Sequence, residues 1–187
     1  MTKGEVARLR TSAAIIDSAA TILAERGDAA SMEEIAAAAG IGRATLYRYF
    51  PNREELLSAM AAASVQELAA RIEEAGLEAV PFEEGVARLA RAIVATGSKY
   101  VSLSADSATY SHAYPDFDVR VTEPIRSLFR RALSEGTLRS DLPSDVLVAM
   151  FSGLLKGALD ATAGGSRGVE ETAAAVTTVF LRGVRSA

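Results

Sequence analysis

Apolar side chains recur along this chain at intervals of three and four residues, the spacing that places them on one face of an α-helix. The first such series runs through Leu9, Ala13, Ile16, Ala20 and Leu23, and it ends at Gly27. Sustained alternation of apolar and polar residues, which is typical of strands, is not found, and neither is a short hairpin turn between β-rich runs. The pattern therefore predicts an all-α protein.

Glycine, proline and capping residues divide the pattern into further helices. Ser31 and Glu34 form a capping-box sequence, in which each side chain satisfies a free backbone amide at the start of a helix. The segment 40–42, Gly-Ile-Gly, separates this helix from a short one over 43–50, which Pro51 ends. Later helices are expected over 54–76, 82–100, from 116 or 124 to 136, over 143–163 and over 170–185, with one short helix between 102 and 114.

The residue types present exclude several kinds of chemistry. The chain has 187 residues, no cysteine and a single histidine, His112. A disulfide framework, a thiolate metal site, an iron–sulfur cluster and a multi-histidine metal centre are therefore excluded. Because no nucleotide-binding glycine motif or readable catalytic triad is found either, we expect no metal, no cofactor and no enzyme activity.

Neither a membrane segment nor an export signal is found. The apolar runs are shorter than the ~18 residues that a membrane helix needs. The N-terminus has no hydrophobic stretch and carries Glu5, unlike a secretion signal. We expect a cytoplasmic protein with no membrane partner.

Charge is distributed unevenly along the chain. Residues 1–53 hold 7 basic and 6 acidic side chains, a net charge of +1, whereas residues 54–187 hold 13 and 18, a net charge of −5. The asymmetry is modest, but it suggests that an anionic partner meets the N-terminal quarter.

Two short helices joined by a tight glycine turn, after a longer helix, match a helix-turn-helix unit. The second helix of such a unit lies in the DNA major groove. With Leu46 and Phe50 facing inward, its outer face offers base-edge donors, a methyl group and phenols that reach phosphates. These residues are Arg43, Ala44, Thr45, Tyr47, Arg48 and Tyr49. From spacing alone, a helical hairpin with a solvated basic face remains the alternative.

Residues 31–57, SMEEIAAAAGIGRATLYRYFPNREELL, strongly resemble the DNA-binding segment of TetR-family transcriptional regulators. The resemblance implies an all-helical homodimer with about nine helices, by analogy of fold. It further implies a DNA-binding domain over 1–53 and an effector-binding and dimerisation domain over 54–187. Gly42 stands where the family often has serine or threonine, and glycine caps a helix less well.

The resemblance also implies roles for individual residues. Arg43, Ala44, Thr45 and Arg48 would read bases, while Tyr47 and Tyr49 would contact phosphates or thymine methyl groups. Arg53 would hold a phosphate, and Ser31 would place the N-terminal amides of its helix against another. Half-buried packing is the alternative for Tyr47. Lys3, Arg8 and Arg10 are expected to be solvated, with loose contacts to the DNA backbone as the alternative.

The resemblance implies a small-molecule site in the C-terminal part of the chain. A mostly apolar pocket with a few polar groups is the usual form of such a site. The candidates are Phe82, Tyr100, Tyr110, His112, Tyr114, Phe117, Phe129 and Phe151. Ordinary core packing or a surface loop is the alternative for each of them.

A dimer surface is indicated by small residues that recur every four positions, since these let two helices approach closely. The stripe and its flank comprise Ala149, Gly153, Leu154, Gly157 and Ala161. The last helix adds Ala173, Thr177, Phe180, Leu181 and Val184. In TetR-like proteins the last two long helices pair with their symmetry mates; packing within one protomer is the alternative.

Two classes of function follow. The first is a DNA-binding transcriptional regulator, expected to be a repressor that a small molecule releases from its operator. The second is a helical ligand-binding or scaffolding protein that retains a helix-turn-helix fold without operator binding. The basic and aromatic face between Arg43 and Arg53 favours the first.

Overall fold

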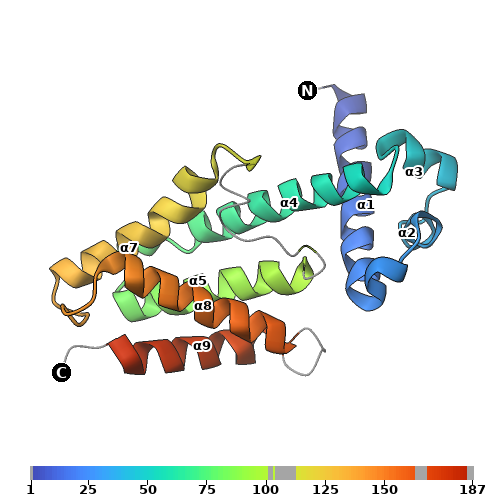
Figure 1. Cartoon of the computed structure of the whole chain (residues 1–187). Coiled ribbons are helices and arrows are strands. Elements are labelled where there is room, and N and C mark those ends of the chain that lie inside the picture. The colour runs from blue at the N-terminus through green and yellow to red at the C-terminus, as the bar shows by residue number, and fades with distance from the viewer. Residues whose placement is uncertain (1, 101–102, 104–112, 163–167, 185–187) are drawn as a thin grey trace. The chain divides into compact units, whose positions relative to one another are not determined.

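The computed structural model describes residues 2–100, 103, 113–162 and 168–184, and this part of the chain contains helices and no β-strand (Figure 1). The prediction of an all-α fold is confirmed. The described α-helices are α1 (Lys3–Arg26), α2 (Met32–Ala38), α3 (Arg43–Tyr49), α4 (Arg53–Glu74), α5 (Phe82–Lys99), α7 (Glu123–Ser134), α8 (Ser144–Thr162) and α9 (Val169–Val184). The short helix expected between 102 and 114 lies almost wholly outside the described residues.

The chain forms two compact units that do not coincide with the predicted domain boundary. The first unit holds residues up to Ser64 together with Lys99, Tyr100 and Leu103, and the second begins at Val65. Helix α4 therefore starts in one unit and ends in the other. The functional division at residues 53 and 54 stays a prediction.

The first unit is built on α1, which is capped at both ends. Thr2 accepts a hydrogen bond from the Glu5 amide at 3.2 Å, and the Glu5 carboxylate accepts one from the Thr2 amide at 2.6 Å. Hydrogen bonding of the Glu5 carboxylate by the backbone amide of Thr2, and then by the Thr2 side chain, lowers the pKa of Glu5. Gly27, with φ of 56°, ends the helix in a conformation that favours glycine.

The core of the first unit differs from the predicted face of α1 at the N-terminal end. Ile15 and Ala19 are fully buried, together with Ile35 of α2, Leu46 of α3 and Leu56 and Met60 of α4. Leu9 and Ala13, which the spacing predicted to face inward, are exposed, Leu9 by 58%, so that part of the prediction is wrong. Helical spacing identifies a face but not how far along the helix its partners extend.

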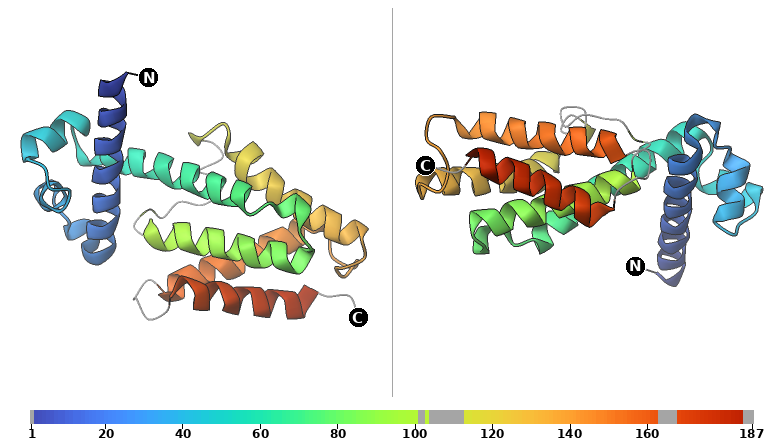
Figure 2. Two further views of the ribbon diagram at one scale, coloured as in Figure 1. Left: turned by 180° about the vertical axis from the view of Figure 1, so that it is seen from behind. Right: turned by 90° about the horizontal axis from the view of Figure 1, so that it is seen from below.

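The second unit packs α5, α7, α8, α9 and the C-terminal part of α4 around a cluster of phenylalanines. The rings of Phe129 and Phe82 meet edge to face at 5.4 Å between centroids, and Phe151 and Phe180 are 4.9 Å apart. Helices α8 and α9 run side by side, orange and red in Figure 2. Gly85 lets α5 approach α7 closely, because a Cβ there would lie 2.9 Å from Leu128 Cδ1.

Candidate nucleic-acid interface

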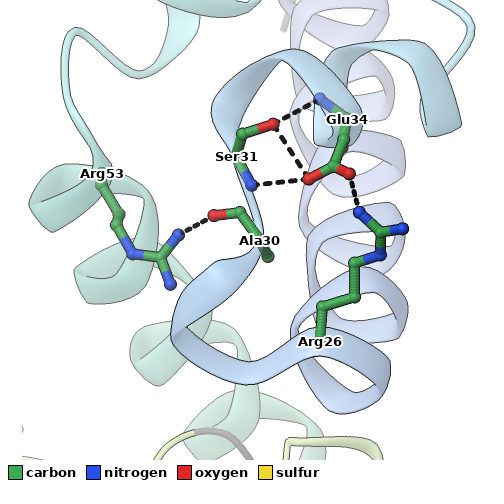
Figure 3. A network of polar contacts seen from close by, with 5 residues as sticks. All are labelled: Arg26, Ala30, Ser31, Glu34 and Arg53. Carbon is green, nitrogen blue, oxygen red and sulfur yellow. Dashed lines mark hydrogen bonds and ion pairs between the residues drawn. The ribbon is translucent and has the colours of Figure 1, made fainter.

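The first helix of the predicted helix-turn-helix, α2, is fixed by a capping box (Figure 3). Ser31 Oγ accepts a hydrogen bond from the Glu34 amide at 3.2 Å, and the Ser31 amide donates to Glu34 Oε2 at 2.9 Å. Arg26, at the end of α1, forms an ion pair with the same carboxylate. The predicted capping box is confirmed. The role of Ser31 beside a phosphate stays a prediction.

The turn between α2 and α3 depends on Gly40, whose φ of 67° is a conformation that residues with a Cβ rarely adopt. The Ile41 amide donates to the Ala36 carbonyl at 3.0 Å, which completes the end of α2. Ile41 packs against the core of the first unit, as expected of a residue between two helices. Gly42 caps α3 through its backbone only, with no side-chain hydrogen bond.

Helix α3 presents the predicted outer face. Leu46 is fully buried and Phe50 is 6% exposed, which confirms the inner face. Arg43, Ala44 and Arg48 are exposed, whereas Thr45, Tyr47 and Tyr49 are half-buried. The exposed members can reach a partner without any change in the core.

The two tyrosines have different surroundings on α3. Both pack against the core of the first unit with part of each ring, so Tyr47 combines packing with a solvent-facing side. The Arg43 guanidinium lies 5.4 Å from the Tyr47 ring centroid and pairs with Glu33 at 2.9 Å. The guanidinium groups of Arg8 and Arg48 each lie 5.9 Å from the Tyr49 ring centroid.

Arg53 has partners that the sequence did not suggest. Its guanidinium donates to the Ala30 carbonyl at 2.5 Å and to the Gly27 carbonyl at 3.5 Å (Figure 3 shows the first bond). Asp28 lies 3.8 Å away and is fully exposed. Arg53 therefore ties the start of α4 to the loop between α1 and α2.

The candidate ligand residues do not gather in one place. Phe82, Phe129 and Phe151 belong to the buried cluster of the second unit, whereas Tyr100 is buried in the core of the first. Tyr110 and His112 lie outside the described residues. The role of all these residues as ligand contacts stays a prediction.

Tyr114 and Phe117 line a small hollow of about 90 Å³ in the second unit. The other walls include Gln66 and Ala69 of α4 and Arg120, which lies in a π-helical turn at Asp118–Thr122. Arg120 donates to Gln66 Oε1 at 2.6 Å across this hollow. The sequence offered no sign of Gln66 or Arg120, because residues far apart in the chain form the hollow.

The predicted dimer surface divides into exposed and buried parts. On α8 the small residues Ala149, Gly153, Gly157 and Ala161 are exposed, and Leu154 is 37% exposed. On α9 the side chains of Ala173, Phe180 and Val184 are at most 4% exposed within the protomer, which leaves little of them for a partner, while Thr177 and Leu181 are half-buried. The interface itself stays a prediction.

Three further apolar residues on these helices, outside the predicted set, are exposed. Val146 and Met150 of α8 are 39% and 53% exposed, and Val179 of α9 is 60% exposed. Val146, Met150 and Leu154 recur every four residues beside the glycines, so the spacing contained this signal.

Within the described residues, no group of histidine and acidic side chains is placed to hold a metal ion. No helix among them is both long and apolar enough to span a membrane.

A family model described as bacterial regulatory proteins, tetR family, matches residues 15–60. The HTH-type transcriptional repressor LfrR of Mycolicibacterium smegmatis is 53% identical over 55 residues, which are 29% of this chain and 29% of the repressor. The sequence match thus spans less than a third of that relative's length.

Solved structures extend the likeness to almost the whole chain. The crystal structure of the TetR-like regulator LfrR from Mycobacterium smegmatis in complex with proflavine has a TM-score of 0.72 and 27% identity, covering 95% of this chain and 99% of that one. The TetR-family regulator PfmR from Thermus thermophilus has a TM-score of 0.71 and 24% identity, covering 90% and 97%. At that identity the second likeness concerns the fold alone.

Proposed function

We propose that the chain is a member of the TetR family of bacterial regulatory proteins and acts as a DNA-binding transcriptional repressor. The observation that carries the proposal is the surface of α3. Arg43, Ala44 and Arg48 are exposed on a helix whose opposite side is anchored by the buried Leu46. Such a helix presents base-edge donors and a methyl-sized side chain at a fixed orientation, as readout in the major groove requires.

The contacts proposed for α3 follow from its exposure pattern. Arg43, Ala44, Thr45 and Arg48 face the base edges, and the hydroxyl groups of Tyr47 and Tyr49 reach the flanking backbone. Arg53 is not included among the phosphate contacts, because carbonyl oxygens of its own unit already accept its hydrogen bonds.

The alternative, a scaffolding protein that keeps the fold without binding an operator, is not favoured. The segment from Arg43 to Arg53 contains the cations and phenol groups that DNA recognition needs. We also propose no catalytic activity for the chain. We propose a cytoplasmic location, as expected from the sequence, because a repressor needs access to chromosomal DNA.

The repressor is proposed to act as a two-fold dimer through the exposed face of α8. Val146, Met150, Gly153 and Gly157 form an apolar surface with small residues among larger ones, and Val179 of α9 adds to it. A two-fold axis brings the same face of both copies together. Two half-sites supply the affinity that one α3 helix lacks against non-specific DNA.

A small molecule is proposed to release the repressor from DNA. The related LfrR structure contains proflavine. The hollow beside Gln66, Phe117 and Arg120 is the proposed entry region, although its volume of about 90 Å³ requires it to widen around a drug-sized compound. Helix α4, which forms one wall, continues into the DNA-binding unit, and coupling between two such sites is typically ~1–3 kcal/mol.

The proposal is tested by mobility-shift titration with the DNA that flanks the gene of this protein. We expect a discrete complex that survives an excess of unrelated duplex. Arg48→Ala and Tyr47→Ala should weaken it, Arg48→Ala by ~1–3 kcal/mol if that side chain pairs with a guanine. Arg126→Ala on α7 removes the same charge from an exposed site in the second unit and serves as the control.

Equal affinity for flanking and unrelated DNA would leave the repressor proposal without support. Proflavine, added to a preformed complex, tests the ligand separately. Because coupling is reciprocal, the operator must weaken proflavine binding by the factor by which proflavine weakens operator binding.

A further inference from the structure

The first unit contains an open hollow of about 260 Å³ between α1 and α3, lined by Gly4, Ala7, Arg8, Thr11, Arg48 and Tyr49. We call this the α1–α3 hollow. Gly4, Ala7 and Thr11 of α1 are small, so the charged and polar groups of the lining come mainly from the two arginines and the tyrosine. Four of its six residues lie outside the segment 31–57 that marks the helix-turn-helix in the sequence.

Two cations converge on one ring at the rim of the α1–α3 hollow. The Arg8 and Arg48 guanidinium carbons are both 5.9 Å from the centroid of Tyr49, so the ring attracts each of them electrostatically. Neither guanidinium group forms an ion pair or a hydrogen bond with any residue that the structure describes. Arg43 on the same helix is instead paired with Glu33. The positive charge at the hollow is therefore not neutralised.

The carboxylate of Glu5 does not line the α1–α3 hollow. Glu5 lines an adjoining hollow with Arg8, Leu9, Ser12 and Tyr49, but it is absent from the walls of the α1–α3 hollow. Its carboxylate is held by the amide of Thr2 in the cap of α1. The lining of the α1–α3 hollow therefore contains two guanidinium groups and no carboxylate, which favours an anion there.

We propose that the α1–α3 hollow seats a phosphate of the DNA backbone, with Arg8 of α1 as the direct contact and Tyr49 as the residue that positions it. Arg48 adds positive potential from the base-reading helix, so that the seated phosphate flanks the bases that α3 contacts. The site rests on the proposed DNA-binding function and extends it to α1. Arg10, two residues away and also exposed on α1, neither lines the hollow nor contacts the ring.

The matched pair Arg8→Gln and Arg10→Gln tests the proposal, because both remove one charge from the same helix. Affinity for a short labelled duplex of unrelated sequence is measured by anisotropy over a range of salt concentrations. Arg8→Gln should make the slope of log K against log salt shallower by about 0.9 for each protomer bound, the effect of one lost phosphate contact. Arg10→Gln should leave the slope unchanged.

The positioning role of Tyr49 has its own readout. In a Tyr49→Leu background, Arg8→Gln should change the slope by less than it does in the wild type, because Arg8 is no longer held over the hollow. Equal slopes for Arg8→Gln and Arg10→Gln would overturn the site, as would an Arg8→Gln effect that Tyr49→Leu leaves undiminished. Circular dichroism of each variant checks that the fold is retained.

Free inorganic phosphate is the other ligand whose charge and oxygen atoms suit this site. Saturable binding of inorganic phosphate by the wild type and not by Arg8→Gln, with unchanged DNA slopes, would also overturn the DNA assignment. Failure of the repressor proposal is distinguishable, because it appears as a lack of preference for flanking DNA. The salt slope on unrelated duplex reports the backbone contact alone.

Discussion

Replacing Arg53 by methionine removes the guanidinium that joins α4 to the loop between α1 and α2. The bond to the Ala30 carbonyl, at 2.5 Å, comes from a charged donor to a residue that is only 4% exposed. Such hydrogen bonds contribute about 1.5–3 kcal/mol. The contact with Gly27 at 3.5 Å is near the limit of a hydrogen bond, and the ion pair with Asp28 at 3.8 Å is exposed and adds little.

We therefore expect Arg53→Met to lower the free energy of unfolding by about 2 kcal/mol, which is roughly a 30-fold change in the unfolding equilibrium. Urea titration followed by circular dichroism measures this difference. Arg71→Met is the matched control, since Arg71 is also on α4 and, among the described residues, pairs only with Glu67, four residues away, at 2.9 Å. A pair of that kind contributes about 0.3–0.5 kcal/mol.

The same variant separates two roles for Arg53. If it supports the fold as the structure indicates, Arg53→Met lowers stability and leaves the salt dependence of DNA binding unchanged. If it holds a phosphate as the sequence suggested, stability matches that of Arg71→Met while the salt slope becomes shallower by about 0.9 per protomer. The second result would refute the reasoning from the carbonyl contacts.

Three further outcomes are expected. Gly157→Leu should convert the proposed dimer to monomers in sedimentation velocity and abolish operator binding, because a Cβ at Gly157 meets no described atom of the protomer within 4 Å and the added side chain would occupy the proposed interface. Ser152→Leu, exposed on another side of α8, should remain dimeric. Ser31→Ala should lower the free energy of unfolding in urea by about 1 kcal/mol through loss of the α2 cap, and an unchanged midpoint would contradict that role. Arg139 donates to the carboxylate of Asp141 at 2.7 and 2.6 Å and holds the pKa of Asp141 below its ordinary 3.8, so this contribution to stability is present above that pH and is lost as the pH falls through the lowered pKa. Asp141→Asn should therefore reduce the fall in the free energy of unfolding at acid pH. An unchanged fall would show that the ion pair contributes nothing to stability.

Local signals in the sequence predicted the helix-turn-helix well. The capping box at Ser31, the turn at Gly40 and the inward Leu46 each depend on residues within a few positions of one another. Interactions of that range are expressed directly in residue spacing. The motif of α3 and its surroundings then carried the resemblance to the family.

Contacts between distant segments were not predictable from the same signals. Tyr100 follows α5 of the second unit, yet its side chain is buried in the core of the first. Arg53 binds carbonyl oxygens 23 and 26 residues earlier in the chain. The spacing of apolar residues does not predict such contacts, because they depend on how the helices pack against one another and not on the formation of each helix.

The two sides of α9 illustrate the same limit. Apolar residues at Ala173, Phe180 and Val184 were compatible with a dimer surface or with the protomer core, and the fold buries them against the phenylalanine cluster. The structure instead shows that Met150 and Val179 are apolar side chains exposed to solvent in the protomer, which the sequence alone does not show. The proposed interface is therefore centred on α8.

Selection from a pool of duplexes with a randomised central region tests most directly whether α3 reads DNA in a two-fold dimer. The account predicts enriched sequences with two-fold symmetry, in which half-site centres lie ~34–36 Å apart or somewhat farther. Arg48→Ala should relax the preference at defined positions of each half-site, and Arg126→Ala should reproduce the wild-type sequences. Bound sequences indistinguishable from the starting pool, from a protein that is folded and dimeric, would contradict the account.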